Sequence, residues 1–124
     1  MKCRNWIESF GHAIRGIGKT VKSERNFRIQ LVLGMVAVVA CILLRVAPWQ
    51  FMLVVFAAVL VLVMELINTA IEALTDLSCK GKIHPLAQKA KDATAGAVLL
   101  ASAFAVVVAV VVAVSVIRQF LGDV

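Results

Sequence analysis

Residues 46–76 read VAPWQFMLVVFAAVLVLVMELINTAIEALTD, and this run decides the fold. Its first part, Val46–Met64, carries no charge and is long enough to cross a bilayer core of about 30 Å as a helix. The polar positions 65, 68, 72 and 76 then fall within about 80° of arc, at 100° per residue. One helix face therefore carries Glu65, Asn68, Glu72 and Asp76. Because an ionised carboxylate in hydrocarbon costs at least about 2.5–3.5 kcal/mol, we expect this face to serve chemistry or ion binding.

The composition is that of a membrane protein. Of the 124 residues 62% are hydrophobic, and the mean hydropathy is +0.98, well beyond the usage of soluble domains. The apolar residues form three blocks, which are Ile29–Leu44, Val46–Met64 and Ala93–Ile117. The length allows one domain, 1–124, and we expect an all-α membrane protein with three spanning helices. The expected helices cover 26–47, 49–76 and 91–118, after a surface helix over 4–22.

The N-terminal stretch predicts that surface helix. Apolar residues recur at helical spacing, with basic and other polar residues between them, at Trp6, Phe10, Ala13, Ile14, Ile17 and Val21. This pattern is typical of a helix that lies in the plane of the lipid headgroups. Gly11, Gly16 and Gly18 weaken it, so we expect a bend or a close backbone contact there. Ser23 is expected to cap the next helix.

The placement of the basic residues predicts the orientation. Of the 13 Lys and Arg, seven precede the first apolar block and four lie between the second and the third. The positive-inside rule then puts the N-terminus and the loop 77–92 in the cytoplasm, and the C-terminus outside. The net charge of +6 comes with no nucleic-acid-binding motif. We therefore attribute it to topology and to attraction by anionic lipid, and expect no nucleic-acid partner.

One motif is misleading. Residues 16–20, GIGKT, end like a phosphate-binding loop, but the first glycine of that motif should stand where this chain has Ala13. Such a loop also needs a preceding strand, and the sequence predicts none. Any phosphate chemistry must use other residues.

Several polar groups are expected to meet at the cytoplasmic membrane surface. They are the segment Glu24–Arg28 at the start of the first span, the polar face that ends the second, Lys91 with Asp92 at the start of the third, and the basic face of the surface helix. Carboxylates there can hold Mg²⁺ together with substrate phosphates, and lysine can bind the phosphates. A further carboxylate can act as a general base toward a hydroxyl. The alternative is a set of structural ion pairs, but so many groups at one depth favour a site.

The motifs resemble those of a known family. The pattern Glu65-x-x-Asn68-x-Ala70-Ile71-Glu72, followed by Ala90-Lys91-Asp92-Ala93 and Gly96-Ala97-Val98, resembles the prokaryotic diacylglycerol kinases, which are small integral-membrane kinases. Within that family, three segments look more like the undecaprenol kinase branch. These are His12-Ala13-x-Arg15-Gly16-Ile17, Ser23-Glu24-Arg25-Asn26-Phe27 and His84-Pro85-Leu86-Ala87.

The resemblance implies a homotrimer in the bacterial cytoplasmic membrane, with sites between subunits at the cytoplasmic surface. It implies that Glu65 is the general base and that Glu24 and Glu72 hold the metal. The nucleotide side would comprise Asn68, Asp76, Lys91, Asp92, His12, Lys82 and His84. The lipid side would comprise Arg15, Asn26 and Gln30. Two positions depart from the family: His12 falls where other members place an aromatic residue, and Gln30 replaces an acid of the diacylglycerol branch.

The sequence therefore predicts a lipid kinase that uses ATP and Mg²⁺ to phosphorylate a membrane alcohol. Undecaprenol is the expected acceptor, and diacylglycerol is the alternative. A different class of function is a small ion-coupled transporter or proton channel, whose carboxylate should lie near the bilayer midplane. A purely structural membrane subunit would leave the placement of Lys91 and Asp92 unexplained.

Overall fold

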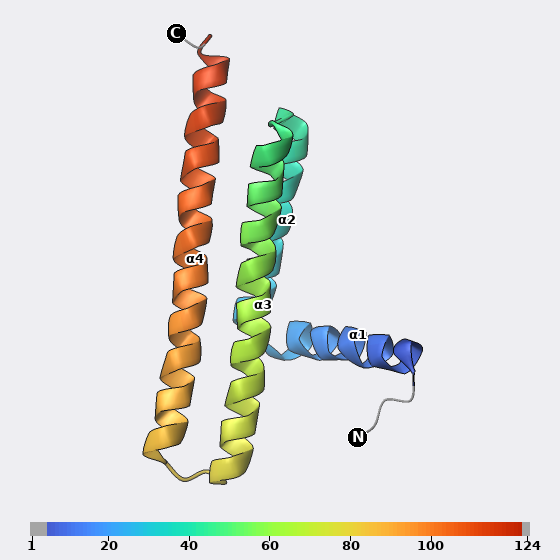
Figure 1. Ribbon diagram of the computed structural model, residues 1–124, viewed down its shortest axis with the longest axis vertical. Coiled ribbons are helices and arrows are strands. Elements are labelled where there is room, and N and C mark those ends of the chain that lie inside the picture. The colour runs from blue at the N-terminus through green and yellow to red at the C-terminus, as the bar shows by residue number, and fades with distance from the viewer. Residues whose placement is uncertain (1–4, 123–124) are drawn as a thin grey trace.

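The computed structural model describes residues 5–122, which form four helices and, within that range, no strand. The helices are α1 (Trp6–Ser23), α2 (Arg25–Leu44), α3 (Pro48–Cys79) and α4 (Pro85–Phe120). Figure 1 shows α2, α3 and α4 running along the long axis, with α1 lying across them. The predicted all-α fold is confirmed.

Three of these helices can cross a membrane. By length and hydropathy, α2, α3 and α4 each qualify, as the three apolar blocks predicted. α3 is the central helix, because it packs against both α2 and α4. Its buried residues recur every three or four positions, at Gln50, Val54, Ala57, Val61 and Glu65. One stripe of α3 therefore faces the rest of the bundle and ends at a carboxylate.

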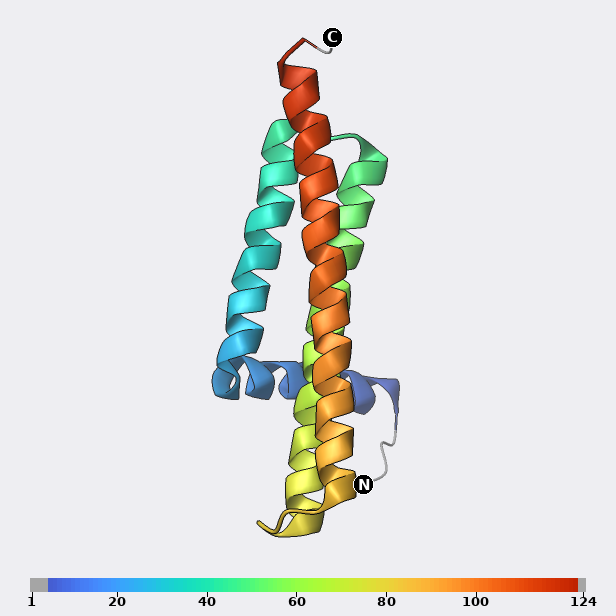
Figure 2. The ribbon, with the colours of Figure 1, turned by 90° about the vertical axis from the view of Figure 1, so that its left-hand side faces the viewer.

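The helices α3 and α4 are longer than their apolar blocks. α3 continues to Cys79, and the chain turns through Lys80 and Gly81, whose φ angles of 50° and 83° lie in the left-handed region. α4 begins at Pro85, six residues before the predicted start at 91, because a proline is well suited to the first turn of a helix. Most of the predicted loop 77–92 is thus helical. In Figures 1 and 2 this helical hairpin extends beyond the level of α1.

The corner between α1 and α2 also differs from the prediction. α1 includes Ser23, which therefore does not cap α2; Glu24 stands at the N-cap position and makes no side-chain capping bond. α1 is a continuous helix, and no atom of the described chain lies within 4 Å of a Cβ built at Gly16 or Gly18. Within residues 5–122, the close contact expected at these two glycines is absent.

A polar clamp holds the end of the bundle opposite α1. Gln50 is 1% exposed, and its Oε1 accepts a hydrogen bond of 3.0 Å from the backbone N–H of Ala47. Its Nε2 donates to Oγ of Ser115 at 2.8 Å. Each half of this buried amide has a partner, as an apolar setting requires. The clamp joins the α2–α3 turn to α4.

Among the glycines of the described chain, Gly34 has the tightest contact with a neighbouring helix. A Cβ built on Gly34 would lie 3.3 Å from Cβ of Ala58, which is tighter than ordinary van der Waals contact. Small residues let two membrane helices approach closely, and dispersion contacts are a main source of helix association in lipid. Larger side chains at Gly34 should push the helices apart.

We predict that Gly34→Val lowers the free energy of unfolding by about 1–3 kcal/mol, because the added methyl groups overpack this contact. The measurement is unfolding of the purified protein in mixed micelles by increasing SDS. The double variant Gly34→Val/Ala58→Gly should recover roughly half of the loss, because it removes the opposing methyl group. Leu33→Val, at a neighbouring position that is 58% exposed, is the control and should change little. Equal losses at Leu33 and Gly34 would contradict the close approach.

Candidate active site

The deepest polar group of the candidate site is Glu65, which lies beside the corner of α1 and α2. Glu65 is 7% exposed, and the corner itself buries Thr20 and Phe27, which are 7% and 2% exposed. Thr20 Oγ1 donates back to the carbonyl of Gly16 at 2.9 Å, so the buried hydroxyl is satisfied within α1. Because α1 contacts both α2 and α3, the surface helix helps to cover the end of the buried stripe on α3.

Glu65 has carboxylates as its charged neighbours. Glu24, at the corner, and Glu72, two turns further along α3, both act on it electrostatically. Within residues 5–122, no group donates a hydrogen bond to the Glu65 carboxylate, and no Lys or Arg pairs with any of the three acids. We call Glu24, Glu65 and Glu72 the acidic cluster. Carboxylates that act on one another in this way favour binding of a cation or a proton.

Asn68 orients one member of this cluster. Its Nδ2 donates to Oε1 of Glu72 at 3.0 Å, four residues further along α3. The face predicted from helical periodicity is therefore present for this pair. The bond fixes one carboxylate oxygen of Glu72 and leaves its other lone pairs available.

The acidic cluster suits a Mg²⁺ site that substrate phosphates complete better than a site built from protein ligands alone. Among the described residues, no three His, Cys, Asp or Glu side chains are placed to hold a metal ion together. A complete protein cage is thus absent from that part of the chain. Mg²⁺ rarely needs one, because it is usually held by one or two carboxylates together with substrate phosphates. The predicted ligands Glu24 and Glu72 fit a Mg²⁺ ion that is bound jointly with a polyphosphate.

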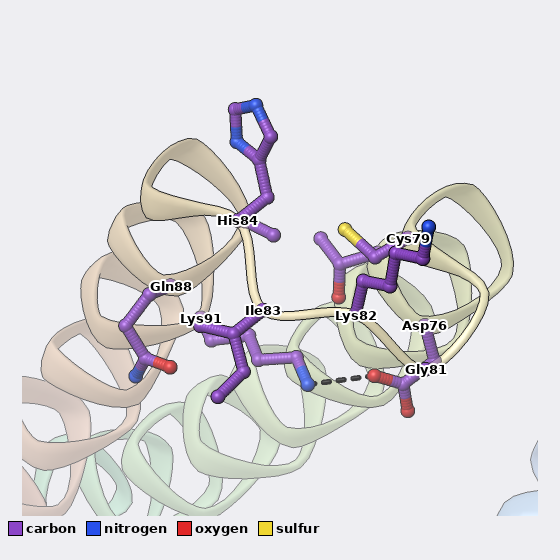
Figure 3. A pocket seen from close by; sticks show the side chains of 10 residues that line it. Asp76, Cys79, Gly81, Lys82, Ile83, His84, Gln88 and Lys91 are labelled. Carbon is purple, nitrogen blue, oxygen red and sulfur yellow. Dashed lines mark hydrogen bonds and ion pairs between the residues drawn. The ribbon is translucent and has the colours of Figure 1, made fainter.

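A second feature lies beyond the cluster, where α3 ends and α4 begins. Here Nζ of Lys91 is 2.6 Å from Oδ1 of Asp76, which bridges the two helices (Figure 3). The side chains are 36% and 68% exposed, so solvent and ligands can reach the ion pair. A pocket of about 200 Å³ opens beside it, and we call it the α3–α4 pocket. Its polar lining includes Asp76, Lys82, His84, Gln88 and Lys91.

Two further residues of the α3–α4 pocket have hydrogen-bond partners. Nε2 of Gln88 donates to Oδ1 of Asp92 at 2.9 Å, so Asp92 is oriented by a residue that the sequence reasoning overlooked. The spacing of Gln88 and Asp92 in the sequence could have revealed this pair, because residues four apart share a helix face. Nδ1 of His84 accepts from the backbone N–H of Leu86 at 3.1 Å and caps α4. In Figure 3 the His84 ring points away from the ion pair.

Four of the predicted residues are not joined to these groups. On α1, Nη2 of Arg15 lies 3.0 Å from Nδ1 of His12, and both side chains are exposed. On α2, Asn26 is exposed and Gln30 is half-buried. Within the described chain, none of the four bonds to the acidic cluster or to the α3–α4 pocket. A single chain thus assembles the carboxylates and the lysine pair, and leaves the predicted lipid side and His12 apart.

Comparison with known proteins agrees with the resemblance seen in the sequence motifs. The family model described as prokaryotic diacylglycerol kinase matches residues 11–113, a range that includes the acidic cluster and the α3–α4 pocket. A diacylglycerol kinase from Synechocystis sp. is 38% identical over 104 residues, which are 84% of this chain and 59% of that protein. An undecaprenol kinase from Bacillus subtilis is 39% identical over 93 residues, 75% of each chain. A diacylglycerol kinase from Escherichia coli K12 is 33% identical over 101 residues, 82% of each chain.

Proposed function

The chain belongs to the prokaryotic diacylglycerol kinase family, and from that premise we propose that it is a lipid kinase that transfers the γ-phosphoryl group of ATP to a membrane alcohol. One observation carries this proposal at the level of residues. Glu65 of α3 is buried beside the surface helix and has no hydrogen-bond donor in the described chain. Further along, α3 carries Asp76, whose ion pair with Lys91 of α4 is accessible to solvent. A base at the membrane boundary and a phosphate-binding cation toward the cytosol suit a lipid kinase.

The chemistry assigned to the chain is a direct displacement. The lipid hydroxyl oxygen forms a bond to the γ-phosphorus, the bond from that phosphorus to the β–γ bridging oxygen breaks, and ADP leaves. Glu65 accepts the hydroxyl proton as general base. Catalysis otherwise depends on positioning and charge neutralisation, as in other phosphoryl transfers.

The remaining acids and the lysine serve the phosphates. Glu24 and Glu72 would hold Mg²⁺, which when bound would neutralise charge on the phosphate oxygens. Asn68 keeps Glu72 oriented, and Asp76 keeps Lys91 directed toward the α3–α4 pocket. Glu65 and Asp76 are eleven residues apart on α3, about 16 Å along the axis at 1.5 Å per residue. A nucleotide with its γ-phosphate at Glu65 would reach that level with its sugar and base, so the long Lys91 side chain would extend back along α3 to bind the phosphates.

We propose the orientation predicted from charge, with the N-terminus and the α3–α4 turn in the cytoplasm and the C-terminus outside. In support, α1 and the α3–α4 turn lie toward one end of the bundle, and the C-terminus lies at the other (Figure 1). The cations divide accordingly. Toward the α1 end lie Arg15, Lys19, Lys22, Arg25, Arg28, Lys80, Lys82, Lys89 and Lys91, while Arg45 and Arg118 lie at the other end.

We also propose a homotrimer, which the family motifs imply. An apolar groove of about 340 Å³ between α2 and α4 supports contact with another copy. Alanines line much of it, at Ala37, Ala40, Ala105, Ala109 and Ala113. Small residues of this kind allow close packing of membrane helices.

For the acceptor we propose undecaprenol. The identities to relatives of both names are nearly equal, so this choice rests on local features. The segments Ser23–Phe27 and His84–Pro85 resemble the undecaprenol kinase branch. Gln30 stands where the diacylglycerol branch has an acidic residue. A groove of about 310 Å³ between α2 and α3, from Leu31 to Leu62, is lined only by apolar side chains and Gly34. It suits a bare hydrocarbon chain, whereas ester carbonyls would find no hydrogen-bond donor among its side chains.

The rival acceptor is diacylglycerol, which requires the same cluster and pocket. The transporter alternative is disfavoured by position, because a coupling carboxylate is expected near the bilayer midplane and Glu65 lies beside the surface helix.

We predict that Glu65→Gln lowers kcat by at least about 10²-fold, which is the typical contribution of a general base. The amide keeps the shape of the side chain but cannot accept the proton, so KM for ATP should change by less than about twofold. The assay uses purified protein in mixed micelles with labelled ATP and a lipid alcohol. Glu8→Gln, in the first turn of α1, is the matched control and should retain full activity. A Glu65→Gln rate above about a tenth of the parent rate would remove the general-base role.

The acceptor is tested by offering undecaprenol and diacylglycerol at matched micelle mole fractions. We expect the higher kcat/KM with undecaprenol. A higher value with diacylglycerol would reverse the assignment of the acceptor and leave the kinase intact. No phosphorylation of either lipid, by protein shown to be folded, would argue against a lipid kinase.

A further inference from the structure

The corner between α1 and α2 is closed by a side chain that the proposed mechanism does not use. One residue, Glu24, joins the two helices, and its backbone N–H donates to the carbonyl of Thr20 at 2.8 Å. Nη1 of Arg28, in the first turn of α2, reaches back to α1. It donates to the carbonyls of Val21 at 2.8 Å and Lys22 at 2.9 Å.

These bonds complete the end of α1. The last four carbonyls of a helix have no partner within it, and here Arg28 and the Glu24 N–H bind three of them. A cation at this end also interacts favourably with the helix dipole. A guanidinium group holds its donors in a rigid plane, so it defines direction better than an ammonium group does. The Arg28 contacts therefore set the angle at which α1 leaves α2.

That angle controls a member of the acidic cluster. Glu24 has an extended backbone, with φ −111° and ψ 111°, and its carboxylate makes no capping bond. The backbone N–H of Arg28 donates to the Glu24 carbonyl at 3.3 Å, so the residue is held from both sides. The direction of its side chain follows from the two helices that flank it.

We propose that Arg28 is a positioning residue, which locks the α1–α2 corner and thereby holds the Glu24 carboxylate toward Glu65 and the bound cation. The inference rests on the proposed role of Glu24 in holding Mg²⁺. Arg28 itself touches neither the metal nor the phosphates in this account, because Nη1 of its guanidinium group is engaged by α1.

A simpler alternative is that Arg28 is one more cytoplasmic positive charge. Arg25 provides the comparison, because it lies in the same turn of α2 with the same charge and makes no hydrogen bond through its side chain in the described chain. If charge alone matters, loss of either arginine should have the same effect. If the corner matters, only loss of Arg28 should change the response to Mg²⁺.

The experiment measures the phosphorylation rate against Mg²⁺ concentration at fixed ATP. In parallel and without turnover, it measures the binding of Mn²⁺ to the protein with a non-hydrolysable ATP analogue by electron paramagnetic resonance, and the same order of variants is expected. Arg28→Met should raise the half-saturating Mg²⁺ concentration about two- to fivefold, which corresponds to the range typical of a cation at a helix C-terminus. The kcat at saturating Mg²⁺ should stay within about twofold, because Mg²⁺ binding is the affected step. Arg28→Lys keeps a donor and should shift the response less than Arg28→Met. Arg25→Met should behave like the parent.

The same measurement in a Glu24→Gln background separates positioning from simple destabilisation. If Arg28 acts through Glu24, adding Arg28→Met to Glu24→Gln should produce little further shift. The inference would be overturned if the double variant shifted the half-saturating Mg²⁺ concentration by the product of the two single shifts. A rate that falls equally at every Mg²⁺ concentration, or equal effects of Arg25→Met and Arg28→Met, would also overturn it. If Arg28→Met does not fold, Arg28→Lys is measured in its place. An unchanged Mg²⁺ response of Arg28→Lys would then contradict the positioning role of Arg28.

The Glu24→Gln variant alone distinguishes the two levels of the account. A shifted Mg²⁺ response in Glu24→Gln with a normal response in Arg28→Met would remove only the role of Arg28. A normal response in Glu24→Gln would remove the proposed metal role of Glu24, and the inference with it.

Discussion

A carboxylate at the end of the apolar part of a membrane-crossing helix must lie where water, a proton or a cation can reach it, and the rest of this structure follows from that constraint. Glu65 ends the buried stripe of α3, and the corner of α1 and α2 lies beside it. α1 runs across the bundle and not along it, so a headgroup-level helix borders the acid (Figure 2). In the proposed mechanism, the cost of placing an ionised group in hydrocarbon keeps the Glu65 carboxylate at the membrane boundary.

α3 links the two parts of the proposed site. Its inner stripe carries Glu65, and its extension beyond the apolar block carries Asp76, which pairs with Lys91 of α4. A rigid helix can hold a base at the lipid boundary and a phosphate-binding group in the aqueous phase at a constant separation. The clamp of Gln50 and Ser115, near the far end of α3, holds that helix against α4.

Local patterns predicted much of this arrangement, and tertiary contacts account for the rest. Apolar length was sufficient for the three spans, and helical periodicity was sufficient for the bond between Asn68 and Glu72. The start of α4 was wrong because Pro85 was taken as part of a loop, although proline also begins helices. Arg28 could not be assigned, since its partners are carbonyls of another helix whose direction the sequence does not specify.

The central claim is that Glu65 lies at the boundary between lipid and cytosol, and depth measurement along α3 tests it most directly. Spin labels would be placed singly on the face opposite Glu65, at Val59, Val63, Ile67, Ala70 and Leu74. Their exposure to oxygen and to a water-soluble nickel chelate would be compared in bilayers. We predict that oxygen dominates at Val59 and Val63, that the chelate dominates at Ala70 and Leu74, and that the crossover falls near Ile67. Oxygen dominance that persists to Leu74 would place Glu65 well inside the bilayer and contradict the account.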